Sequence, residues 1–346
     1  MKFSQGSTMG FCNKCCAEKI VLTVLVTGAN GFVGSHIVET LLEEKHRVLC
    51  VIRKTSNLKW IKNLPLDYIC GDLNNKSFLE TNIKNVDVVV HCAGIVRAMD
   101  REKYFETNVG HTKTLCEVIL KNNCNLKKFI FISSQAAMGP SKSDCARRIT
   151  DRENPVSDYG LSKLAAELEI RKILQGKVPY TILRPACVYG PRDKDIFIFF
   201  NLVHKHIRPV TIRERLLQLV YVKDVAKAVV ACLENEKSNN NIYYLADSIA
   251  YTWADIGKTI SSSVGVNTIQ LPVPDFVFRL AATVSEIFSY VKKKPVVLNK
   301  QKVAEMLQKY WIADTQPAEI DLNIKFTCLE VASKITYNWY LENGFF

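Results

Sequence analysis

The stretch that decides the fold is Thr27-Gly28-Ala29-Asn30-Gly31-Phe32-Val33-Gly34. Residues 20–26 before it read Ile-Val-Leu-Thr-Val-Leu-Val, an almost wholly apolar run. Such a run predicts a parallel strand that is buried on both faces. After it, apolar residues recur at helical spacing as far as Lys45: Phe32, Val33, Ile37, Val38, Leu41 and Leu42. The glycines therefore stand where a buried strand turns into a helix.

Each glycine of this stretch has a task in a dinucleotide-binding turn. Gly28 permits the tight turn, Gly31 lets the backbone approach a pyrophosphate, and Gly34 lets the helix pack closely on the strand. The helix N-terminus offers free N–H groups and a partial positive charge to the phosphates. The spacing therefore predicts a dinucleotide site at the first strand-to-helix turn.

Strands and helices alternate through the first half of the chain. Strands are predicted at residues 47–52, 66–70, 86–92, 128–133 and 180–184, and helices at 76–83, 104–121 and 159–174. This alternation predicts an α/β fold with a doubly wound parallel sheet, a Rossmann fold.

Beyond Pro185 the alternation stops, and a smaller, mostly helical substrate domain is predicted. Its helices are expected at residues 193–206, 252–264, 275–291, 299–308 and 329–342. We expect a dinucleotide-binding domain over residues 20–185, completed by 219–248, which includes strands at 219–222 and 241–246 with a helix at 224–233 between them. The substrate domain then takes residues 186–218 and 249–346, and residues 1–19 are expected to be a disordered tail.

The charge and the apolar runs limit the classes of partner. The net charge is +12, but the lysines are scattered, with short clusters only at Lys127-Lys128 and residues 292–294. A lysine-rich surface and an attraction for anionic ligands both explain this, and we expect a small-molecule substrate and no nucleic acid. No apolar run reaches the roughly 18 residues of a membrane-spanning helix, so no integral span is expected.

The cysteines indicate a reducing compartment. Of the 12 cysteines, Cys50, Cys70, Cys92 and Cys232 lie in apolar strand or helix patterns, where a free thiol acts as a small hydrophobe. We therefore expect a cytoplasmic protein without a disulfide framework. A second group, Cys12, Cys15 and Cys16, has no further Cys/His pair nearby, so no metal is predicted there.

One predicted helix, residues 275–291, is apolar almost all round. Burial against the rest of the domain explains this pattern. The alternative is a membrane-surface or apolar-substrate role, with surface association through residues 275–294 and their terminal lysines.

Three side chains downstream form a candidate reaction centre. Ser134 ends the fifth predicted strand, and Tyr159 and Lys163 lie one turn apart at the start of a helix, so they share a face. A free tyrosine, with a pKa near ~10, is a poor base. A nearby ammonium and an oxidised nicotinamide would lower that pKa, so the phenol could exchange a proton while hydride moves. Ser134 would orient the same substrate oxygen.

The chain resembles an extended short-chain dehydrogenase/reductase of the NAD-dependent epimerase/dehydratase type over about residues 20–342. The resemblance rests on residues 27–34, 71–73, 91–94, 108–110, 133–134, 184–191 and 221–225 together with Tyr159 and Lys163. It implies that Ser134, Tyr159 and Lys163 are the catalytic trio, and that Lys163 also holds the nicotinamide ribose. It places Asp72 and Leu73 by the adenine, and Ala93 and Gly94 by the cofactor's ribose and phosphates. It also implies a homodimer that pairs through the helices at 104–121 and 159–174.

The full set of cofactor-binding candidates follows from the turn, the end of the second strand and the resemblance. They are Gly28, Asn30, Gly31, Phe32, Val33, Arg53, Lys54, Asp72, Leu73, Cys92, Ala93, Gly94, Tyr159, Lys163, Pro185 and Val188.

Two departures from the family pattern bear on the choice of cofactor and on the type of reaction. An acidic residue should follow the second strand if the site holds the ribose diol of NAD, but Arg53-Lys54 stand there. This cation pair favours NADP, and NAD remains the alternative if Arg53 only stacks on adenine. Family members that dehydrate nucleotide sugars carry an Asp-Glu pair after the catalytic Ser/Thr. Gln135-Ala136 stand there instead, which argues against 4,6-dehydratase chemistry.

The expected function is hydride transfer between a nicotinamide and a secondary alcohol or ketone. One hypothesis is an epimerase or 4-keto reductase of a nucleotide sugar, whose pyrophosphate would meet Arg192, Arg213 and Arg215. The alternative is a reductase or dehydrogenase of an apolar compound such as a sterol, similar to 3-beta-hydroxysteroid dehydrogenase. A third hypothesis is a cofactor-binding regulator without turnover.

Overall fold

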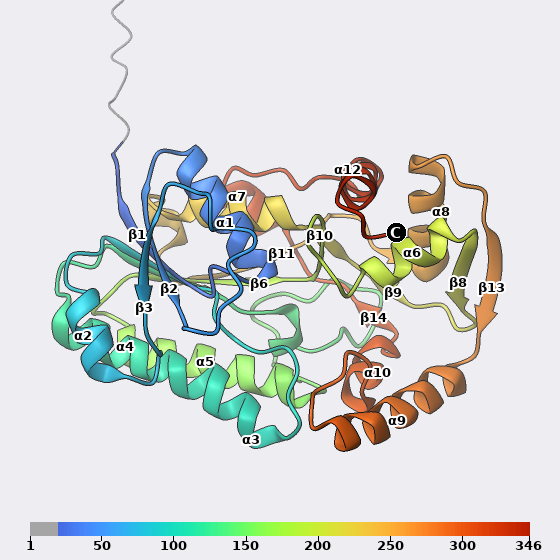
Figure 1. Cartoon of the computed structure of the whole chain (residues 1–346), viewed down its shortest axis with the longest axis horizontal. Coiled ribbons are helices and arrows are strands. Elements are labelled where there is room, and N and C mark those ends of the chain that lie inside the picture. Colours follow the sequence, from blue (N-terminus) through green and yellow to red (C-terminus); the bar gives the residue numbers. More distant parts are fainter. Residues whose placement is uncertain (1–19) are drawn as a thin grey trace, which may run out of the picture.

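The computed structural model describes residues 20–346, so the predicted tail and its three cysteines lie outside the described residues. A seven-stranded parallel sheet forms the centre of the larger lobe (Figure 1), with the order β11-β6-β5-β4-β1-β2-β3. The strands are β1 Thr23–Thr27, β2 Arg47–Ile52, β3 Asp67–Cys70, β4 Val88–His91, β5 Lys128–Ile132, β6 Tyr180–Pro185 and β11 Asn241–Leu245. The predicted doubly wound sheet is confirmed.

Helices cover both faces of this sheet. On one face, α1 (Phe32–Glu43) packs against α7 (Val222–Cys232), with the short α11 (Gln316–Asp321) beside β11. On the other face lie α2 (Lys76–Asn82), α4 (His111–Asn122) and α5 (Asp158–Leu174) (Figure 1). Because both faces are covered, the central strands β1, β4 and β5 are almost entirely buried, which explains their unbroken apolar runs.

The second lobe is mostly helical and lies on the right in Figure 1. Its helices are α6 (Phe197–His204), α8 (Trp253–Ser263), α9 (Asp275–Lys292), α10 (Lys300–Met306) and α12 (Leu329–Glu342). Its aromatic core joins α6, α8 and α12 through side chains such as Phe200, Tyr337 and Tyr340. The helix α10 packs against α9 and faces the start of α5 in the larger lobe.

Short strands outside the main sheet form three further small sheets. β7 (Cys187–Tyr189) pairs with β10 (Leu219–Tyr221), and β8 (Ile207–Thr211) with β13 (Ile269–Val273), both in parallel. The two-residue strands β9 (Leu216–Leu217), β12 (Tyr251–Thr252) and β14 (Tyr310–Trp311) form a third small sheet. The strand predicted at residues 219–222 therefore pairs outside the main sheet.

Two predicted helices differ from expectation. The helix expected over residues 104–121 is divided into α3 (Arg101–Tyr104), a π-helical turn (Phe105–Gly110) and α4. The apolar helix expected to be buried is α9, and of its side chains only Ala282 and Ser289 are buried. The burial hypothesis for this helix is wrong, because its packing face consists mostly of small and polar residues, and Phe278 is the large apolar residue that is partly buried there.

Candidate functional site

The glycine-rich turn has the geometry of a phosphate cradle. Gly28 has φ +71°, and a Cβ there would lie 2.7 Å from the Ala93 backbone nitrogen. A Cβ at Gly34 would lie 2.1 Å from the Gly28 carbonyl oxygen. Helix α1 begins after Gly31, and no side chain caps its N-terminus. The first turn of α1 therefore presents backbone N–H groups without a side-chain cap, as an anion site requires.

The carboxyl ends of β1, β2 and β4 meet beside this turn. The Thr27 hydroxyl accepts a hydrogen bond from the Ala93 N–H at 3.2 Å, which fixes the residues after β4 next to the glycines. Arg53 and Lys54 follow β2 and are exposed, with the Arg53 N–H donating to Ser56 Oγ at 2.9 Å. Both cations are therefore free of side-chain partners in the described residues.

The other cofactor candidates line the same edge. Asp72 is exposed and Leu73 buried directly after β3. Cys92 is partly buried, and burial raises the pKa of its thiol to about 11. Pro185 ends β6 and Val188 lies in β7, paired with Val220 of β10.

The remaining cofactor-binding candidates are Asn30, Phe32 and Val33 of the glycine-rich turn, and Gly94 after β4. The Asn30 amide donates to the Asn57 carbonyl at 3.4 Å, and Phe32 and Val33 form the first turn of α1. Gly94 is exposed, and a Cβ there would lie 3.0 Å from Asn108 Oδ1.

The proposed catalytic trio converges at the carboxyl end of β5. Ser134 follows this strand, and Tyr159 and Lys163 lie in the first two turns of α5. The Lys163 ammonium donates to the Ile132 carbonyl at 2.6 Å and lies 4.2 Å from the centre of the Phe131 ring. The Tyr159 hydroxyl is hydrogen-bonded with Ser134. The Ser134 and Tyr159 hydroxyls are therefore in contact, and the Lys163 ammonium is held at the end of β5.

Burial sets the proton affinities of this trio. It raises the pKa of Tyr159 to about 12, although the hydrogen bond with Ser134 acts in the opposite direction. Burial also lowers the pKa of Lys163 to about 8, while the Cys92 and Glu167 side chains oppose that change. In the protein alone the phenol is protonated at neutral pH, and a positive charge brought beside it would lower its pKa.

A buried ion pair fixes α5 against β5 and β6. Arg184 and Glu167 are both fully buried, and Glu167 Oε2 accepts from the guanidinium at 2.6 Å while Oε1 accepts from Nε at 3.0 Å. The Ser133 hydroxyl donates to the same carboxylate. Since Ser133 precedes Ser134 and Glu167 lies one turn after Lys163, this pair sets the distance between the strand and helix that carry the trio.

The π-helical turn positions a further side chain that sequence reasoning left without a role. Asn108 is buried, donates to Ser162 Oγ at 2.9 Å and to the Ile95 carbonyl at 3.0 Å, and accepts from the Ile95 N–H at 2.8 Å. It therefore joins the loop after β4 to α5. Its motif with Val109 and Gly110 was visible in the sequence, and π-turns are frequent at functional sites.

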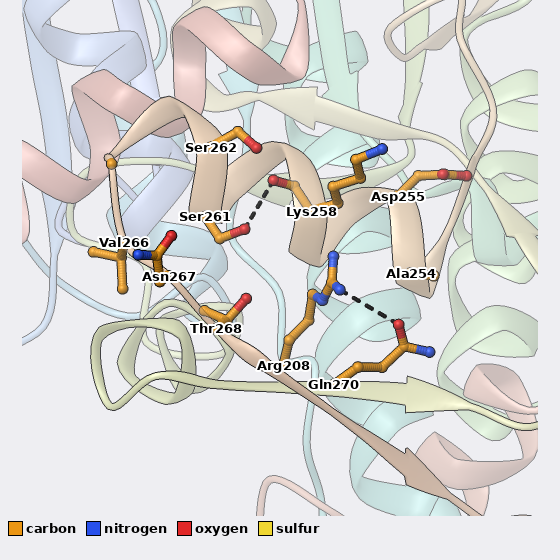
Figure 2. A pocket seen from close by; sticks show the side chains of 11 residues that line it. Arg208, Ala254, Asp255, Lys258, Ser261, Ser262, Val266, Asn267, Thr268 and Gln270 are labelled. Atoms are coloured by element: carbon orange, nitrogen blue, oxygen red, sulfur yellow. Dashed lines mark hydrogen bonds between the residues drawn. The ribbon is translucent and has the colours of Figure 1, made fainter.

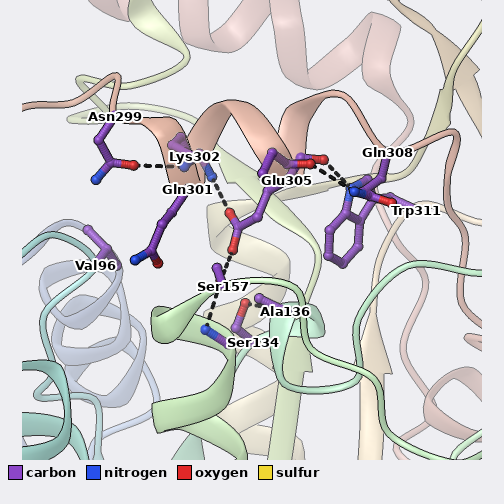
Figure 3. A network of polar contacts seen from close by, with 12 residues as sticks. Val96, Ser134, Ala136, Ser157, Asn299, Gln301, Lys302, Glu305, Gln308 and Trp311 are labelled. Carbon is purple, nitrogen blue, oxygen red and sulfur yellow. Dashed lines mark hydrogen bonds and ion pairs between the residues drawn. The ribbon is translucent and has the colours of Figure 1, made fainter. Parts of the chain in front are cut away.

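Sequence reasoning missed a second pair, Lys302 and Glu305 of α10 (Figure 3). The Lys302 ammonium donates to Glu305 Oε2 at 3.2 Å, and Ser157, which caps α5, donates to Glu305 Oε1. Burial alone would lower the pKa of Lys302, but the Glu305 carboxylate raises it above its ordinary value. Tyr159 and Cys187 are close enough to act on the same ammonium. A charged pair from the smaller lobe therefore faces the trio.

Of the three arginines proposed for a pyrophosphate, Arg213 and Arg215 meet at Asp275, whereas Arg192 contacts α1. Arg192 ion-pairs with Glu39 at 2.5 Å and donates to Ser35 of α1. Arg215 is buried, ion-pairs with Asp275 at 2.7 Å and donates to two backbone carbonyls. Arg213 is largely exposed, 3.9 Å from Asp275. All three guanidiniums thus already have a carboxylate partner, and all three stay predictions as substrate ligands.

A shallow polar hollow on the smaller lobe lies apart from the trio (Figure 2). Its volume is about 690 Å³, and its lining includes Arg208, Lys258 and Asn267 from β8, α8 and the loop before β13. None of the trio lines it. Within residues 20–346, no group of three metal-ligating side chains and no helix able to cross a membrane is found.

A dinucleotide fits the residues of the larger lobe. The missing Cβ atoms of Gly28 and Gly34 let the turn pack closely on the backbone after β4 and on the start of α1, whose first turn has no side-chain cap. The model of the NAD dependent epimerase/dehydratase family matches residues 24–246, which include this cradle and the trio. The chain belongs to this family.

Relatives within this family differ in their substrates. UDP-glucose 4-epimerase of Vibrio cholerae is 30% identical over 76% of this chain and 82% of that protein. Ceramide reductase of Caulobacter vibrioides is 25% identical over 93% of this chain and 95% of that protein. Among solved structures, UDP-glucuronic acid 4-epimerase from Bacillus cereus, with UDP-glucuronic acid and NAD, has a TM-score of 0.72. It is 24% identical and covers 93% of this chain and 100% of its own, which shows the shared fold.

Proposed function

We propose that this chain is an NAD(P)-dependent oxidoreductase that acts on a secondary alcohol or ketone of a nucleotide sugar, as an epimerase or a 4-keto reductase. The observation that carries the proposal is the convergence of Ser134, Tyr159 and Lys163 at one end of β5. When bound, the nicotinamide would supply hydride chemistry. The UDP-sugar epimerase relative supports a nucleotide sugar as the first substrate class to test.

Each residue of the trio has a separate task. Tyr159 would give a proton to, or take one from, the substrate oxygen, and Ser134 would hold that oxygen by a hydrogen bond. Lys163 would hold a ribose hydroxyl and stabilise the phenolate by its charge. The phenol's high pKa favours the proton-donating direction, which is the reduction of a ketone.

The substrate class is tested by incubation of the purified protein with UDP-glucose and oxidised NAD or NADP, and with UDP-4-keto sugars and NADH or NADPH. Epimerised sugar, or loss of reduced cofactor that depends on the keto sugar, supports the proposal. Tyr159→Phe should remove this activity while cofactor affinity remains. No conversion of any nucleotide sugar by a protein that reduces other ketones would overturn this substrate class.

A second substrate class is an apolar hydroxy or keto compound. The observation that favours it is the pairing of Arg192 with Glu39 and of Arg215 with Asp275, because a pyrophosphate would have to compete with these carboxylates. The full-length match to ceramide reductase supports the same class. Oxidation of NADPH by a long-chain ketone in detergent, but not by keto sugars, would select this alternative.

For the cofactor, we propose a preference for NADP over NAD. The exposed cations Arg53 and Lys54 follow β2, where a carboxylate would instead bind the ribose diol and repel a 2′-phosphate. A charge-assisted hydrogen bond is worth roughly 1.5–3 kcal/mol, which is about tenfold to over a hundredfold in affinity. Arg53→Asp should reverse the order of NADPH and NADH affinities in fluorescence titrations. Tighter binding of NADH by the unaltered protein would overturn the proposal.

For the assembly, we propose a homodimer through α4 and α5 in the cytoplasm. Leu168 of α5 is 53% exposed, which supports an interface on this face. The buried free thiols of Cys50, Cys116 and Cys232 support a reducing compartment. Leu168→Glu should convert the dimer to a monomer in light scattering, and a wild-type monomer would refute the pairing.

A further inference from the structure

The helix α9 presents its apolar side chains to solvent. Five of them are more than half exposed: Phe276 66%, Leu280 60%, Ile287 60%, Phe288 57% and Val291 77%. Tyr290 at 71%, Val284 at 44% and Val277 at 39% adjoin them. At about 100° per residue, these positions form one stripe roughly 160° wide along the helix. Surface helices normally turn such a stripe to the core, so α9 is inverted.

Mostly small and polar side chains, together with the partly buried Phe278, hold the inner face of α9 against the protein. Ala282 and Ser289 are buried, and the Ser289 hydroxyl donates to the Lys294 carbonyl at 2.6 Å. Glu286 ion-pairs with Lys300 at 3.2 Å and accepts from its backbone N–H at 2.8 Å. The orientation of the helix is therefore fixed by specific contacts, and its outward stripe is a built feature of the surface.

The charged side chains beside the stripe that have no ion-pair partner are all positive. The acidic residues of α9 are Asp275 and Glu286, and both are in ion pairs with basic residues. Arg279 and residues 292–294, three successive lysines at the end of the helix, are exposed. An apolar stripe with free cations beside it is complementary to a surface that is apolar inside and anionic at its rim.

We propose that α9 binds flat on a bilayer surface that contains anionic lipids. The stripe would enter the boundary between headgroups and acyl chains, and Arg279 and the terminal lysines would meet the lipid phosphates and carboxylates. The helix would lie in the membrane plane, because none of the described helices can cross a bilayer. A second copy of this chain fits less well. A parallel two-fold contact would bring the same lysines together, and an antiparallel one would place them near Arg279 and an Asp275 that is already paired with Arg215.

The orientation has a consequence for the reaction site. The helix α10 packs on the inner side of α9 and carries Lys302 and Glu305, which face the trio (Figures 1 and 3). A bilayer bound to α9 would therefore lie on the opposite side of α9 from α10, and α10 carries the side chains that face the trio. Membrane binding through the outward stripe of α9 is compatible with either substrate class proposed above.

Vesicle flotation of the full chain tests this inference without any activity measurement. We expect binding to vesicles of phosphatidylcholine and phosphatidylserine, and at least tenfold weaker binding to phosphatidylcholine alone. The double variant Leu280→Ser/Ile287→Ser should reduce binding at least tenfold. Lys292→Glu/Lys294→Glu should reduce it more than twentyfold, because each cation near an anionic surface contributes about fivefold. Raised salt should weaken binding of the unaltered chain.

Ile320→Ser is the matched control, because Ile320 of α11 is 69% exposed but lies outside the stripe. It should bind vesicles as the unaltered chain does. The proposal is overturned if the unaltered chain fails to float with anionic vesicles. It is equally overturned if the control loses as much binding as the stripe variant. Conversion of a dimer to a monomer by Leu280→Ser/Ile287→Ser, without any vesicle binding, would assign the stripe to a second copy instead.

Discussion

Replacement of Glu167 by Gln tests the ion pair that sets the distance between β5 and α5. Glu167 and Arg184 are fully buried, and the carboxylate accepts from Nε, from a terminal guanidinium nitrogen and from Ser133. Gln keeps one acceptor but turns an N–H₂ group toward a donor, and it leaves the buried guanidinium with only the more distant carboxylate of Glu153, 3.9 Å away. Loss of one partner of a buried pair costs about 3–5 kcal/mol.

This cost predicts a measurable shift in the melting temperature. At about 2.1 cal/mol/K per residue, a chain of 346 residues has an unfolding entropy of about 0.7 kcal/mol/K. The Tm of Glu167→Gln should therefore fall by about 4–7 °C in circular dichroism melts. The matched control is Glu117→Gln, whose partner Lys76 lies 3.2 Å away with both side chains exposed. A surface pair of this kind contributes at most about 1 kcal/mol, so its Tm should move by at most about 1.5 °C.

A double variant separates charge from packing. If Glu167→Met/Arg184→Met loses less stability than the sum of its two single variants, the single losses come from the uncompensated charge. The reasoning fails if Glu167→Gln melts within 2 °C of the unaltered protein, about the range expected of the surface control.

Three further results are expected. Tyr159→Phe should lower kcat by about 10²–10⁴ with unchanged cofactor affinity, and retention of a third of the activity would remove the assigned role. Gly28→Ala should abolish NADPH binding in fluorescence titration, because its Cβ would lie 2.7 Å from the Ala93 nitrogen at φ +71°, and wild-type affinity would contradict this. Burial lowers the pKa of His36 to about 4 and of His91 to about 3, so the unfolded chain binds more protons below its pKa of 6.5. Each histidine should thus lower the free energy of unfolding by about 1.4 kcal/mol as pH falls from about 7.5 to about 5.5. His91→Gln should make the stability less dependent on pH in melts over this range. An unchanged pH dependence would contradict the buried, neutral state of His91.

The parts of the fold that depend on local pattern were predictable. The bounds predicted for β2 and α12 match the structure, because alternating burial and helical spacing are local properties of the chain. The adjacency of Tyr159 and Lys163 follows from one helical turn in the same way. The site residues as a set remain predictions until a ligand is observed.

The rest depends on contacts between distant segments. Lys302 and Glu305 face Tyr159 from a helix more than 140 residues away, and no local pattern marks them. The pairing of β8 with β13 joins short strands whose side chains are mostly not buried, so neither has a clear alternation. For α9 the apolar composition was visible in the sequence, but the face that packs against the protein was not. That face is marked by buried small residues such as Ala282 and Ser289, which no apolar pattern distinguishes.

The contacts between α10 and the start of α5 limit how modular this enzyme is. Ser157 caps α5 and donates to Glu305, while Asp158 exchanges two hydrogen bonds with Gln301. The helix that carries Tyr159 and Lys163 is thus completed by side chains that the smaller lobe supplies. A chimera that joins this larger lobe to a relative's smaller lobe would inherit the glycine-rich turn intact. Its helix α5 would begin correctly only if Gln301 and Glu305, or equivalents at their positions, were transplanted with it.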